Sequence, residues 1–323
     1  MPKGKYIIEF SLAPGDVIVS TALIRDLKRT YPDYQFDFRT NVSSMLIGNP
    51  HLTPLQDNDP DVEVVKLCYM EQMRKATTGD SLHFIEAFHR DFTAKTGLPV
   101  EALEAKPDLH MTIRERLEPP VSGRYWVVMG GGKADFTVKH WEYTRYNEVV
   151  DRLHAYGLRF VQTGATKKGH THPRIDQALP LVGWGYMREL VNLIYHSEGV
   201  ICPLTCGMHI AAAFDKPCVV IAGGRESASW TAYCNGFDNF PKAPPVKVEH
   251  QFLHTVGRLS CCERSGCWRN KVVQTDEDKN VCTKLATRPI GYQPLPLCMD
   301  MITVDHVVEA VLSYYEKGLL APL

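Results

Sequence analysis

Short apolar runs alternate with amphipathic segments along this chain, and that alternation most constrains its fold. In the N-terminal part, apolar runs are bounded by turn residues and separated by stretches whose apolar residues recur at helical spacing. We therefore expect strands at 6–10, 34–39 and 62–67 and helices at about 17–31 and 81–96. Strands that alternate with helices predict a mostly parallel sheet covered by helices.

The alternation stops in a polar, proline-containing stretch near 101–123, which we interpret as a linker, and then resumes. The second block predicts strands at 125–129, 158–164, 199–202 and 218–222 and helices near 144–156, 186–196, 206–214 and 303–316. The fold class is therefore α/β, with two Rossmann-like doubly wound domains. We expect an N-terminal domain at 1–118, a second domain at 119–300 that includes a Cys-rich segment at 252–300, and a C-terminal helix at 301–323.

Length and charge narrow the class of function. The 323 residues are enough for two domains, and 36 basic residues nearly cancel 37 acidic ones. Bulk electrostatics therefore give no reason to expect a nucleic-acid partner. The N-terminus shows no signal-peptide core, and no run of about 18 apolar residues occurs. We expect a cytoplasmic protein without a membrane span.

Asp16 lies at the expected junction between the first strand and the first helix. An acidic residue in a first helical turn can simply complement the positive end of the helix dipole. A carboxylate at the mouth of a cleft can also act as a general base that accepts a proton from an attacking hydroxyl. The local pattern leaves both interpretations open.

A Gly-Gly-Gly-Lys stretch follows the first strand of the second block. Glycines at 130–132 let backbone amides approach an anion closely, and Lys133 and Lys139 add positive charge to the same loop. The glycine spacing fits neither the Walker pattern nor the dinucleotide fingerprint. The loop is therefore a candidate anion site without a motif that names its ligand.

A second candidate anion site follows the expected strand at 199–202. Thr205 can cap the next helix, whose N-terminal amides could face a diphosphate. His209 lies in that helix, and taken alone it is more typical of a structural histidine.

Together these stretches resemble glycosyltransferase family 9, the ADP-heptose-dependent heptosyltransferases. The resemblance covers most of residues 5–235 in order. It rests on Gly15-Asp16-Val17, Lys139-His140-Trp141, Thr163-Gly164, the Gly183 turn before Glu189-Leu190, and Gly207-Met208-His209 with Ala211-Ala212-Ala213.

The resemblance implies a GT-B fold and an inverting transferase. Asp16 becomes the general base that deprotonates an acceptor hydroxyl, with no divalent cation required for transfer. The implied donor-binding residues are Gly130, Gly131, Lys139, Thr163, Gly164, Thr205, Cys206, Gly207 and His209, and the acceptor-binding residues are Gly15 and His83. The implied donor is a nucleotide-diphosphate sugar, ADP-heptose or a related compound, and the acceptor is a glycan, a protein or another hydroxyl compound. The oligomeric state stays open.

The chain departs from the family pattern in the donor region. The family has Asp-Thr-Gly before the histidine, whereas this chain reads Leu204-Thr205-Cys206 with Gly207 one place later. The loop after Thr163-Gly164 also lacks an acidic residue for the ribose. The base and the sugar of the donor therefore stay open.

Half of the ten cysteines cluster between 261 and 298. In a reducing compartment, such clustering favours a metal over disulfides. Four thiolates can close a tetrahedral zinc or iron site, and we expect the ligands to be Cys262, Cys267, Cys282 and Cys298, with Cys261 able to replace Cys262. Buried free thiols or a redox pair are the alternative. The segment resembles the four-cysteine iron site of heptosyltransferases that modify autotransporters, and such a metal is structural.

Several aromatic residues and histidines have simpler interpretations. Trp126 and Trp141 are expected to pack in the core, and Trp230 and Tyr233 are candidates for the wall of the donor pocket. His83 and His89 lie on a predicted helix near a possible acceptor cleft, and their simpler interpretation is that both are solvated.

Two other functions remain compatible with the sequence. A GT-B-fold nucleotide-sugar epimerase would consume the donor without an acceptor. A non-catalytic nucleotide-sugar-binding module would explain the missing aspartate before Thr205. The pairing of Asp16 with Lys139 favours the transferase, because simple binding does not require a base.

Overall fold

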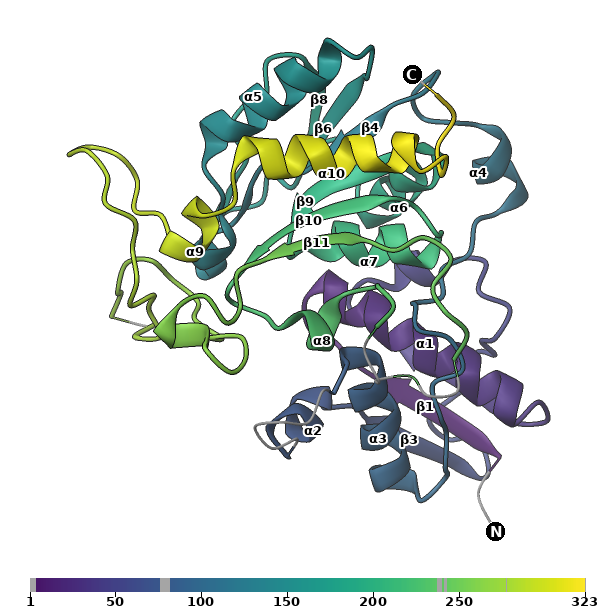
Figure 1. Ribbon diagram of the computed structural model, residues 1–323. Coiled ribbons are helices and arrows are strands. Elements are labelled where there is room, and N and C mark those ends of the chain that lie inside the picture. Colours follow the sequence, from purple (N-terminus) through teal and green to yellow (C-terminus); the bar gives the residue numbers. More distant parts are fainter. Residues whose placement is uncertain (1–3, 76–81, 237–239, 241–242, 277, 323) are drawn as a thin grey trace.

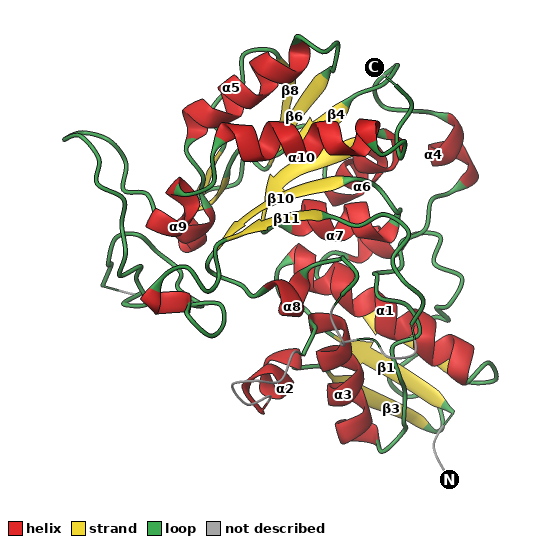
Figure 2. Cartoon of the chain, viewed as in Figure 1, coloured by secondary structure: helices red, strands yellow, loops and turns green. Residues whose placement is uncertain are grey.

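The computed structural model describes residues 4–75, 82–236, 240, 243–276 and 278–322, which form two α/β domains stacked one above the other (Figure 1). Each domain has a parallel sheet with helices packed against it (Figure 2). In the described part of the chain, no helix is long and apolar enough to cross a membrane.

The N-terminal domain has a three-stranded parallel sheet in the order β2-β1-β3. Its strands are β1 (Lys5–Glu9), β2 (Gln35–Arg39) and β3 (Val62–Lys66), and its longer helices are α1 (Pro14–Thr30), α2 (Tyr69–Lys75) and α3 (Phe84–Thr96). Every residue of α1 from Val17 to Leu27 is buried, since α1 lies between this sheet and the second domain.

The second domain has six parallel strands in the order β11-β10-β9-β4-β6-β8. They are β4 (Trp126–Val128), β6 (Phe160–Gly164), β8 (Ala178–Val182), β9 (Gly199–Pro203), β10 (Cys218–Gly223) and β11 (Gln251–His254). After β4 the chain adds β6 and β8 on one side of the sheet, and after β9 it adds β10 and β11 on the other side. The order therefore reverses between β4 and β9, which is where ligands bind in doubly wound sheets.

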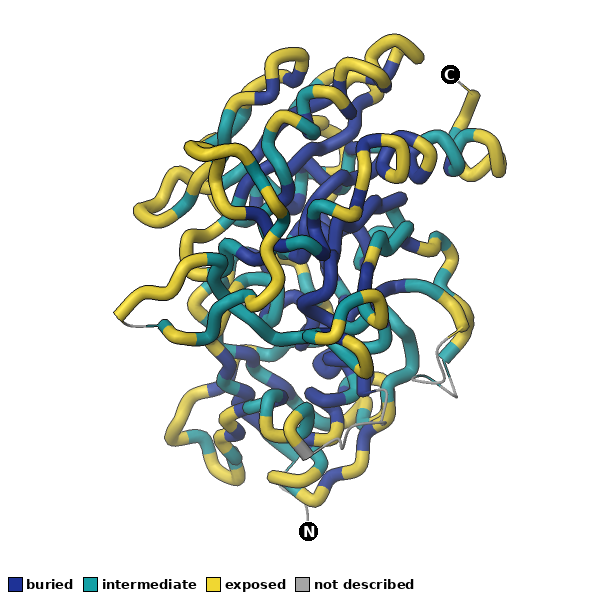
Figure 3. The backbone as a smooth tube through the Cα atoms, turned by 60° about the vertical axis from the view of Figure 1, so that its left-hand side comes forward, coloured by how far each residue is buried: buried dark blue, intermediate teal, exposed yellow. Residues whose placement is uncertain are grey.

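Alternate residues of these strands enter two different cores. Trp126 and Val128 pack with helices α5 (Tyr143–His154) and α10 (Val304–Glu316), whereas Val127 packs toward α6 (Met187–His196) and α7 (Cys206–Ala213). The second core continues into the N-terminal domain and includes residues of α1 and α3. The two domains thus share one apolar core, and buried residues run through the middle of the molecule (Figure 3).

The predicted packing roles are confirmed. Trp126 and Trp141 are almost completely buried, and their indole N–H groups donate to Tyr315 Oη at 2.7 Å and to the Ile302 carbonyl at 2.9 Å. The C-terminal helix begins where expected, because the Thr303 side chain accepts a hydrogen bond from the backbone N–H of His306 at 3.3 Å. Its apolar stripe docks on the outer face of the second sheet.

Several elements differ from the sequence predictions. Edge strands β8 and β11 were not expected, and β11 moves the start of the Cys-rich segment from 252 to after His254. The expected helix at 81–96 begins at Phe84, and Ser81 lies outside the described residues. The linker contains a short helix, α4 (Ile113–Leu117), with a capping box between Thr112 and Glu115. The domain boundary at 118 stays a prediction.

Short elements complete the fold. The Gly-rich stretch contributes β5 (Gly132–Lys133), which pairs antiparallel with β7 (His170–Thr171). The remaining helical turns are η1 (Ser43–Leu46), η2 (Ala134–Lys139), α8 (Ala228–Thr231), η3 (Ser260–Cys262) and α9 (Leu297–Asp300).

Candidate active site between the two domains

The starts of helices α1 and α7 meet at the junction between the domains. Each follows the carboxyl end of a central strand, β1 in the first sheet and β9 in the second. A Cβ atom on Gly15 would lie 3.1 Å from His209 Cδ2 and 3.6 Å from the Cα of Cys206. Gly15 therefore allows the two helix starts to approach closely, and the fold brings the two predicted sites together.

Asp16 lies half-buried in the first turn of α1, and its Oδ1 accepts a hydrogen bond from Tyr69 Oη at 3.0 Å. Burial raises the pKa of Asp16, and nearby Glu226 adds to this effect, whereas the Tyr69 hydrogen bond and Lys139 oppose it. A carboxylate with a raised pKa is a better proton acceptor than an exposed one. The environment of Asp16 is therefore compatible with a general base, and this role stays a prediction.

Lys139 ends η2 and extends toward the same junction. Its Nζ donates to the Leu204 carbonyl at 3.2 Å and forms an ion pair with Glu226 Oε1 at 3.1 Å. Burial lowers the pKa of Lys139, and the ion pair with Glu226 opposes that change. Leu204 occupies the position at which the family has an aspartate. At this position Lys139 contacts the backbone carbonyl of Leu204, because the leucine side chain offers no carboxylate.

Glu226 and Arg225 belong to the site but were missed from the sequence. Both are buried, both follow β10, and Arg225 forms an ion pair with Glu226. Burial by itself raises the pKa of Glu226, but Lys139 and Arg225 together hold it below its ordinary value. The sequence does contain a signal for this pair. Arg225 and Glu226 follow Gly223-Gly224 at the carboxyl end of a strand, which is where α/β sheets bind ligands.

His209 is buried in α7, with Nδ1 2.6 Å from Tyr233 Oη. Burial lowers the pKa of His209 to about 3 and raises the pKa of Tyr233 well above its usual range. The imidazole and the phenol are therefore both neutral, and the hydrogen bond between them can run in either direction. The other ring nitrogen of His209, Nε2, lies 3.5 Å from the position of a Cβ on Gly15, so this atom faces the start of α1.

The start of α7 differs in detail from the prediction. Thr205 occupies the N-cap position, but among the described residues its side chain makes no capping hydrogen bond; its hydroxyl points to Met129 Sδ at 3.9 Å. Burial raises the pKa of the Cys206 thiol to about 12, so this side chain is neutral. A Cβ on Gly207 would lie 2.5 Å from Met129 Sδ, which explains the glycine by packing.

The other predicted donor-binding glycines pack around one histidine. A Cβ on Gly131 or on Gly164 would overlap the ring of His172, and the Gly131 Cβ would also overlap the Thr171 carbonyl. Gly130 has a similar reason to lack a side chain, since a Cβ there would lie 3.0 Å from Ile175. Thr163, next to Gly164, is buried at the end of β6. These glycines are required by close packing whether or not their amides bind an anion.

His83 and His89 are buried, so the expectation that they are solvated is wrong. His83 is 1% exposed, caps α3 through Nδ1 to the Ile85 N–H at 3.2 Å, and packs between the rings of Tyr233 and Phe240. His89 Nε2 lies 3.0 Å from Asp26 Oδ2. The role of His83 in acceptor binding stays a prediction.

A pocket of about 360 Å³ opens beside Asp16 at the carboxyl ends of β1 and β3. Tyr69 belongs both to the pocket wall and to the hydrogen bond with Asp16. The other lining residues are Glu9, Phe10, Ser11, Leu12, Lys66, Leu67, Cys68 and Met70. Asp16 itself does not line the pocket, so Tyr69 is the residue that connects the pocket with the candidate base.

Three of the four predicted metal-ligating cysteines, Cys262, Cys267 and Cys298, lie around Gly224, just after β10. A Cβ on Gly224 would lie 3.0 Å from Cys262 Sγ and 3.3 Å from Cys298 Cβ, and the Cys267 N–H donates to the Gly224 carbonyl at 3.0 Å. Burial raises the pKa of Cys298 to about 12, and Cys282, Cys267 and Cys262 add to this effect.

These thiols are near one another without being at ligand spacing. Among the described residues, no three cysteine Sγ atoms lie within 4.8 Å of one another, and no described cysteine forms a disulfide. The donor set nevertheless fits a tetrahedral thiolate site for zinc or iron. Cys261 lies next to Cys262 in η3 and is half-buried.

Residues 22–240 match the sequence profile of glycosyltransferase family 9 (heptosyltransferase), and this stretch is well over half of the chain. The chain belongs to glycosyltransferase family 9. It is therefore a glycosyltransferase that uses a nucleotide sugar, and the family membership favours this activity over the epimerase and the non-catalytic module. No curated protein sequence matches the chain.

Solved structures support the fold of this family 9 glycosyltransferase. The family 9 glycosyltransferase from Veillonella parvula DSM 2008 superposes with a TM-score of 0.61 at 11% identity, over 98% of this chain and 99% of that one. For the E. coli ADP-heptose LPS heptosyltransferase II, the TM-score is 0.56 at 15% identity, over 98% and 100% of the two chains. For TibC, an iron-containing dodecameric glycosyltransferase from enterotoxigenic E. coli H10407, the values are 0.59 and 15%, over 98% and 76%. The predicted GT-B fold is confirmed.

Proposed function

We propose that this glycosyltransferase transfers a heptose or a related sugar from a nucleotide-diphosphate sugar to an acceptor hydroxyl, with inversion and with Asp16 as the general base. One observation carries the proposal. A carboxylate from the first domain and a lysine from the second lie close enough for each to influence the pKa of the other. Substrate binding alone gives no reason for this pairing, whereas transfer between two substrates uses both charges.

The acceptor hydroxyl enters through the pocket lined by Tyr69, the hydrogen-bond partner of Asp16. Asp16 takes the hydroxyl proton while the acceptor oxygen forms a bond to the anomeric carbon. The bond from that carbon to the diphosphate oxygen breaks on the opposite face, so the configuration inverts and the nucleoside diphosphate leaves. Asp16 then releases its proton to solvent.

Negative charge grows on the leaving diphosphate, and the second domain supplies positive potential there. Lys139 and the backbone N–H groups at the start of α7 stabilise that charge more in the transition state than in the ground state. Glu226 holds Lys139 in place before the donor binds. With a lysine and a helix start in these positions, a divalent cation is not required for departure of the diphosphate.

His209 is the proposed donor of a hydrogen bond to the sugar or to a phosphate oxygen. Its neutral ring and its fixed contact with Tyr233 orient Nε2 toward the junction. The glycines at 130, 131, 164 and 207, with Thr163, Thr205 and Cys206, form the surrounding walls of the donor site. An ADP sugar is the first donor to test, because TibC has been solved in complex with ADP-D-beta-D-heptose.

Cys262, Cys267, Cys282 and Cys298 are proposed to hold a structural zinc or iron ion, with Cys261 as the alternative to Cys262. The proposal is supported by the position of Cys262, Cys267 and Cys298 around Gly224, by the electrostatic effect of Cys282 on Cys298, and by the iron content of TibC. The ion would supply crosslinks that order a segment with few buried apolar residues. Metal analysis of the purified chain tests this proposal. We expect one equivalent of zinc or iron that the Cys282→Ser variant lacks. An unchanged metal content in this variant contradicts the proposal.

The donor site is tested by thermal unfolding in the presence of ADP, UDP, GDP, CDP or dTDP. A nucleotide at about 100 times its dissociation constant adds about 2.7 kcal/mol to the free energy of unfolding. We expect one nucleotide to shift the transition selectively. The matching nucleotide sugar is then incubated with and without acceptor, and the anomeric configuration of the product is read by NMR. No shift with any nucleotide contradicts the donor site, and donor conversion without acceptor indicates the epimerase.

A further inference from the structure

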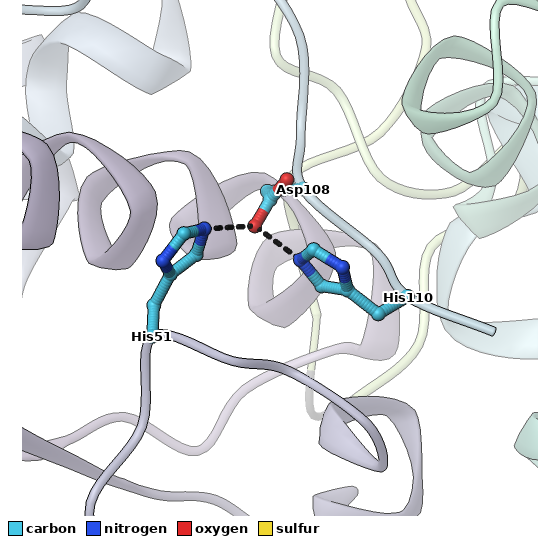
Figure 4. A group of neighbouring side chains, drawn as sticks. All are labelled: His51, Asp108 and His110. Atoms are coloured by element: carbon cyan, nitrogen blue, oxygen red, sulfur yellow. Dashed lines mark hydrogen bonds and ion pairs between the residues drawn. The ribbon is translucent and has the colours of Figure 1, made fainter. Parts of the chain in front are cut away.

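A second group of potential metal ligands lies at the junction between the first domain and the linker, away from the cysteines. It consists of His51, which follows η1, and of Asp108 and His110, which lie between α3 and α4. Figure 4 shows the two imidazole rings pointing toward the carboxylate of Asp108 from opposite sides. All three side chains are half-buried.

The ligand atoms are close to the spacing that a metal requires. Asp108 Oδ2 lies 2.7 Å from His110 Nε2 and 3.5 Å from His51 Nε2, and one ligand atom from each residue lies within 4.8 Å of the others. Zinc binds nitrogen and oxygen at about 2.0–2.2 Å, which places tetrahedral ligand atoms about 3.3 Å apart. Small side-chain movements therefore suffice to seat an ion.

The surrounding backbone holds this arrangement in place. The Asp108 N–H donates to Thr21 Oγ1 of α1 at 2.8 Å, and the His110 carbonyl accepts from Arg188 Nη2 of α6 at 2.9 Å. The His51 N–H donates to Asn49 Oδ1 at 2.9 Å. These contacts fix the backbone of the two segments that carry the three side chains.

A glycine brings the two segments together. Gly48 has a φ of +78°, a backbone conformation that side chains disfavour, and a Cβ there would lie 3.9 Å from His110 Cβ. The turn that carries His51 thus lies directly against the linker.

The nearby positive charges are already neutralised. Arg25 and Arg29 act electrostatically on His51, but Arg25 is paired with Asp26 and Arg29 with Glu104. A cation at the site therefore faces the negative charge of Asp108 without two uncompensated guanidinium groups beside it.

We propose that His51, Asp108 and His110 bind a divalent transition-metal ion, with Zn²⁺ as the first candidate, that ties the linker to the first domain. Two imidazoles and one carboxylate suit this class of metal, and they leave the fourth position of a tetrahedral ion for water. The alternative is a histidine–aspartate hydrogen-bond network that holds the same segments without an ion. The site does not rest on the proposed transfer reaction.

Co²⁺ is the probe that separates this site from the cysteines. Thiolate ligands give Co²⁺ an intense near-ultraviolet charge-transfer band, whereas imidazole and carboxylate ligands give only weak visible bands. The full chain, stripped with a chelator and kept under reducing conditions, is titrated with Co²⁺ and then with Zn²⁺ as competitor. We expect an equivalent of Co²⁺ that adds visible absorption without adding to the thiolate band.

In the double variant His51→Gln/His110→Gln, we expect the affinity for that equivalent of Co²⁺ to fall by more than about 100-fold, because the loss of an outer-sphere partner alone lowers metal affinity by about 10- to 100-fold. The control His196→Gln replaces a half-buried histidine that contacts the Glu115 carbonyl at 2.7 Å, and it should leave the equivalent unchanged. Asp108→Asn, which keeps the shape of the side chain, should weaken binding as well.

The thiolate band and the thermal transition report whether each variant is folded. Equal Co²⁺ binding by the parent chain and by the folded variants overturns the proposal and leaves the hydrogen-bond network. Absorption from thiolate-bound Co²⁺ alone in the parent chain overturns it too.

Discussion

The two sheets of this glycosyltransferase present opposite charges to the same junction. In the small domain, Asp16 lies in the first turn of the helix that follows the central strand, and it is hydrogen-bonded to Tyr69. The six-stranded sheet surrounds its reversal point with Lys139, the start of α7 and neutral His209. The small domain therefore carries a proton acceptor, and the large domain carries groups suited to an anion. The difference supports the proposal that the acceptor binds the first domain and the nucleotide sugar binds the second.

The two domains also differ in how they complete their cores. The outer face of the large sheet is covered by its own α5 and α10, whereas α1 of the small domain packs against α7 of the large one. The candidate base therefore lies on a helix that both domains help to bury. The position of Asp16 therefore depends on domain docking, and substitutions on either side of the junction are expected to change the activity.

The largest expected effect comes from removing the base. Asp16→Asn keeps the shape of the side chain, and we expect kcat to fall by about 10²- to 10⁴-fold, the usual contribution of general base catalysis. Nucleotide binding, measured by calorimetry, should stay the same because the proposed nucleotide site belongs to the other domain. The exposed residue Asp151 provides a control, Asp151→Asn, which should behave like the parent chain. A variant at 16 that retains a tenth of the parent rate contradicts the base assignment.

The next largest effect is expected on the anion side. Lys139→Met should lower kcat by about 10²- to 10³-fold, comparable to the loss of one preorganised charge-stabilising group, and should weaken nucleotide binding as well. It also removes an ion-pair partner of buried Glu226, so stability is expected to fall. The double variant Lys139→Met/Glu226→Gln separates the two effects, since it should recover stability in chemical denaturation without recovering transfer. Recovery of transfer in the double variant would place the role of Lys139 in folding alone.

The smallest effect is a shift of the pH profile. The Tyr69 hydrogen bond opposes the rise in the pKa of Asp16, so Tyr69→Phe should raise that pKa further. Asp16 must be ionised to accept a proton, and the acid limb of the kcat profile should therefore move to higher pH while the rate on the alkaline side changes little. Tyr31→Phe removes a phenol that contacts the Pro99 carbonyl, away from the junction, and serves as control. An acid limb that stays in place or moves to lower pH refutes the coupling between Tyr69 and Asp16.

Local sequence patterns predicted most elements of the fold in order. The strand at 218–222 is a continuous apolar run, and the strand at 6–10 is apolar except for Glu9, because both faces of a central parallel strand are buried. The strands that were missed, β8 and β11, are edge strands with half-buried or exposed residues, and so lack that signature. The helix at 303–316 was predictable to within a residue, since its cap and its apolar stripe are both local.

Some residues of the candidate site were predictable from local sequence patterns, and others were not. Asp16 and Lys139 were found from the sequence because each follows a recognisable strand, and the family resemblance gave both a role. Tyr69 was not singled out, since nothing near it in sequence marks it as a partner of a residue 53 positions away. The sequence predicts that Gly131 contacts an anion, and the family resemblance makes Gly164 a donor-binding residue, but only the structure shows that both pack against His172.

The sequence by itself determined the two α/β blocks, the family and the identity of the candidate base, because periodicity, turn residues and motif order are properties of short segments. The tertiary structure decided which charges meet. The docking of α1 on α7 placed Asp16 near Lys139 and Glu226, and the path of the linker placed His51 beside Asp108. Those contacts join segments far apart in the chain, and they exist only once the shared core excludes water and fixes the two domains against each other.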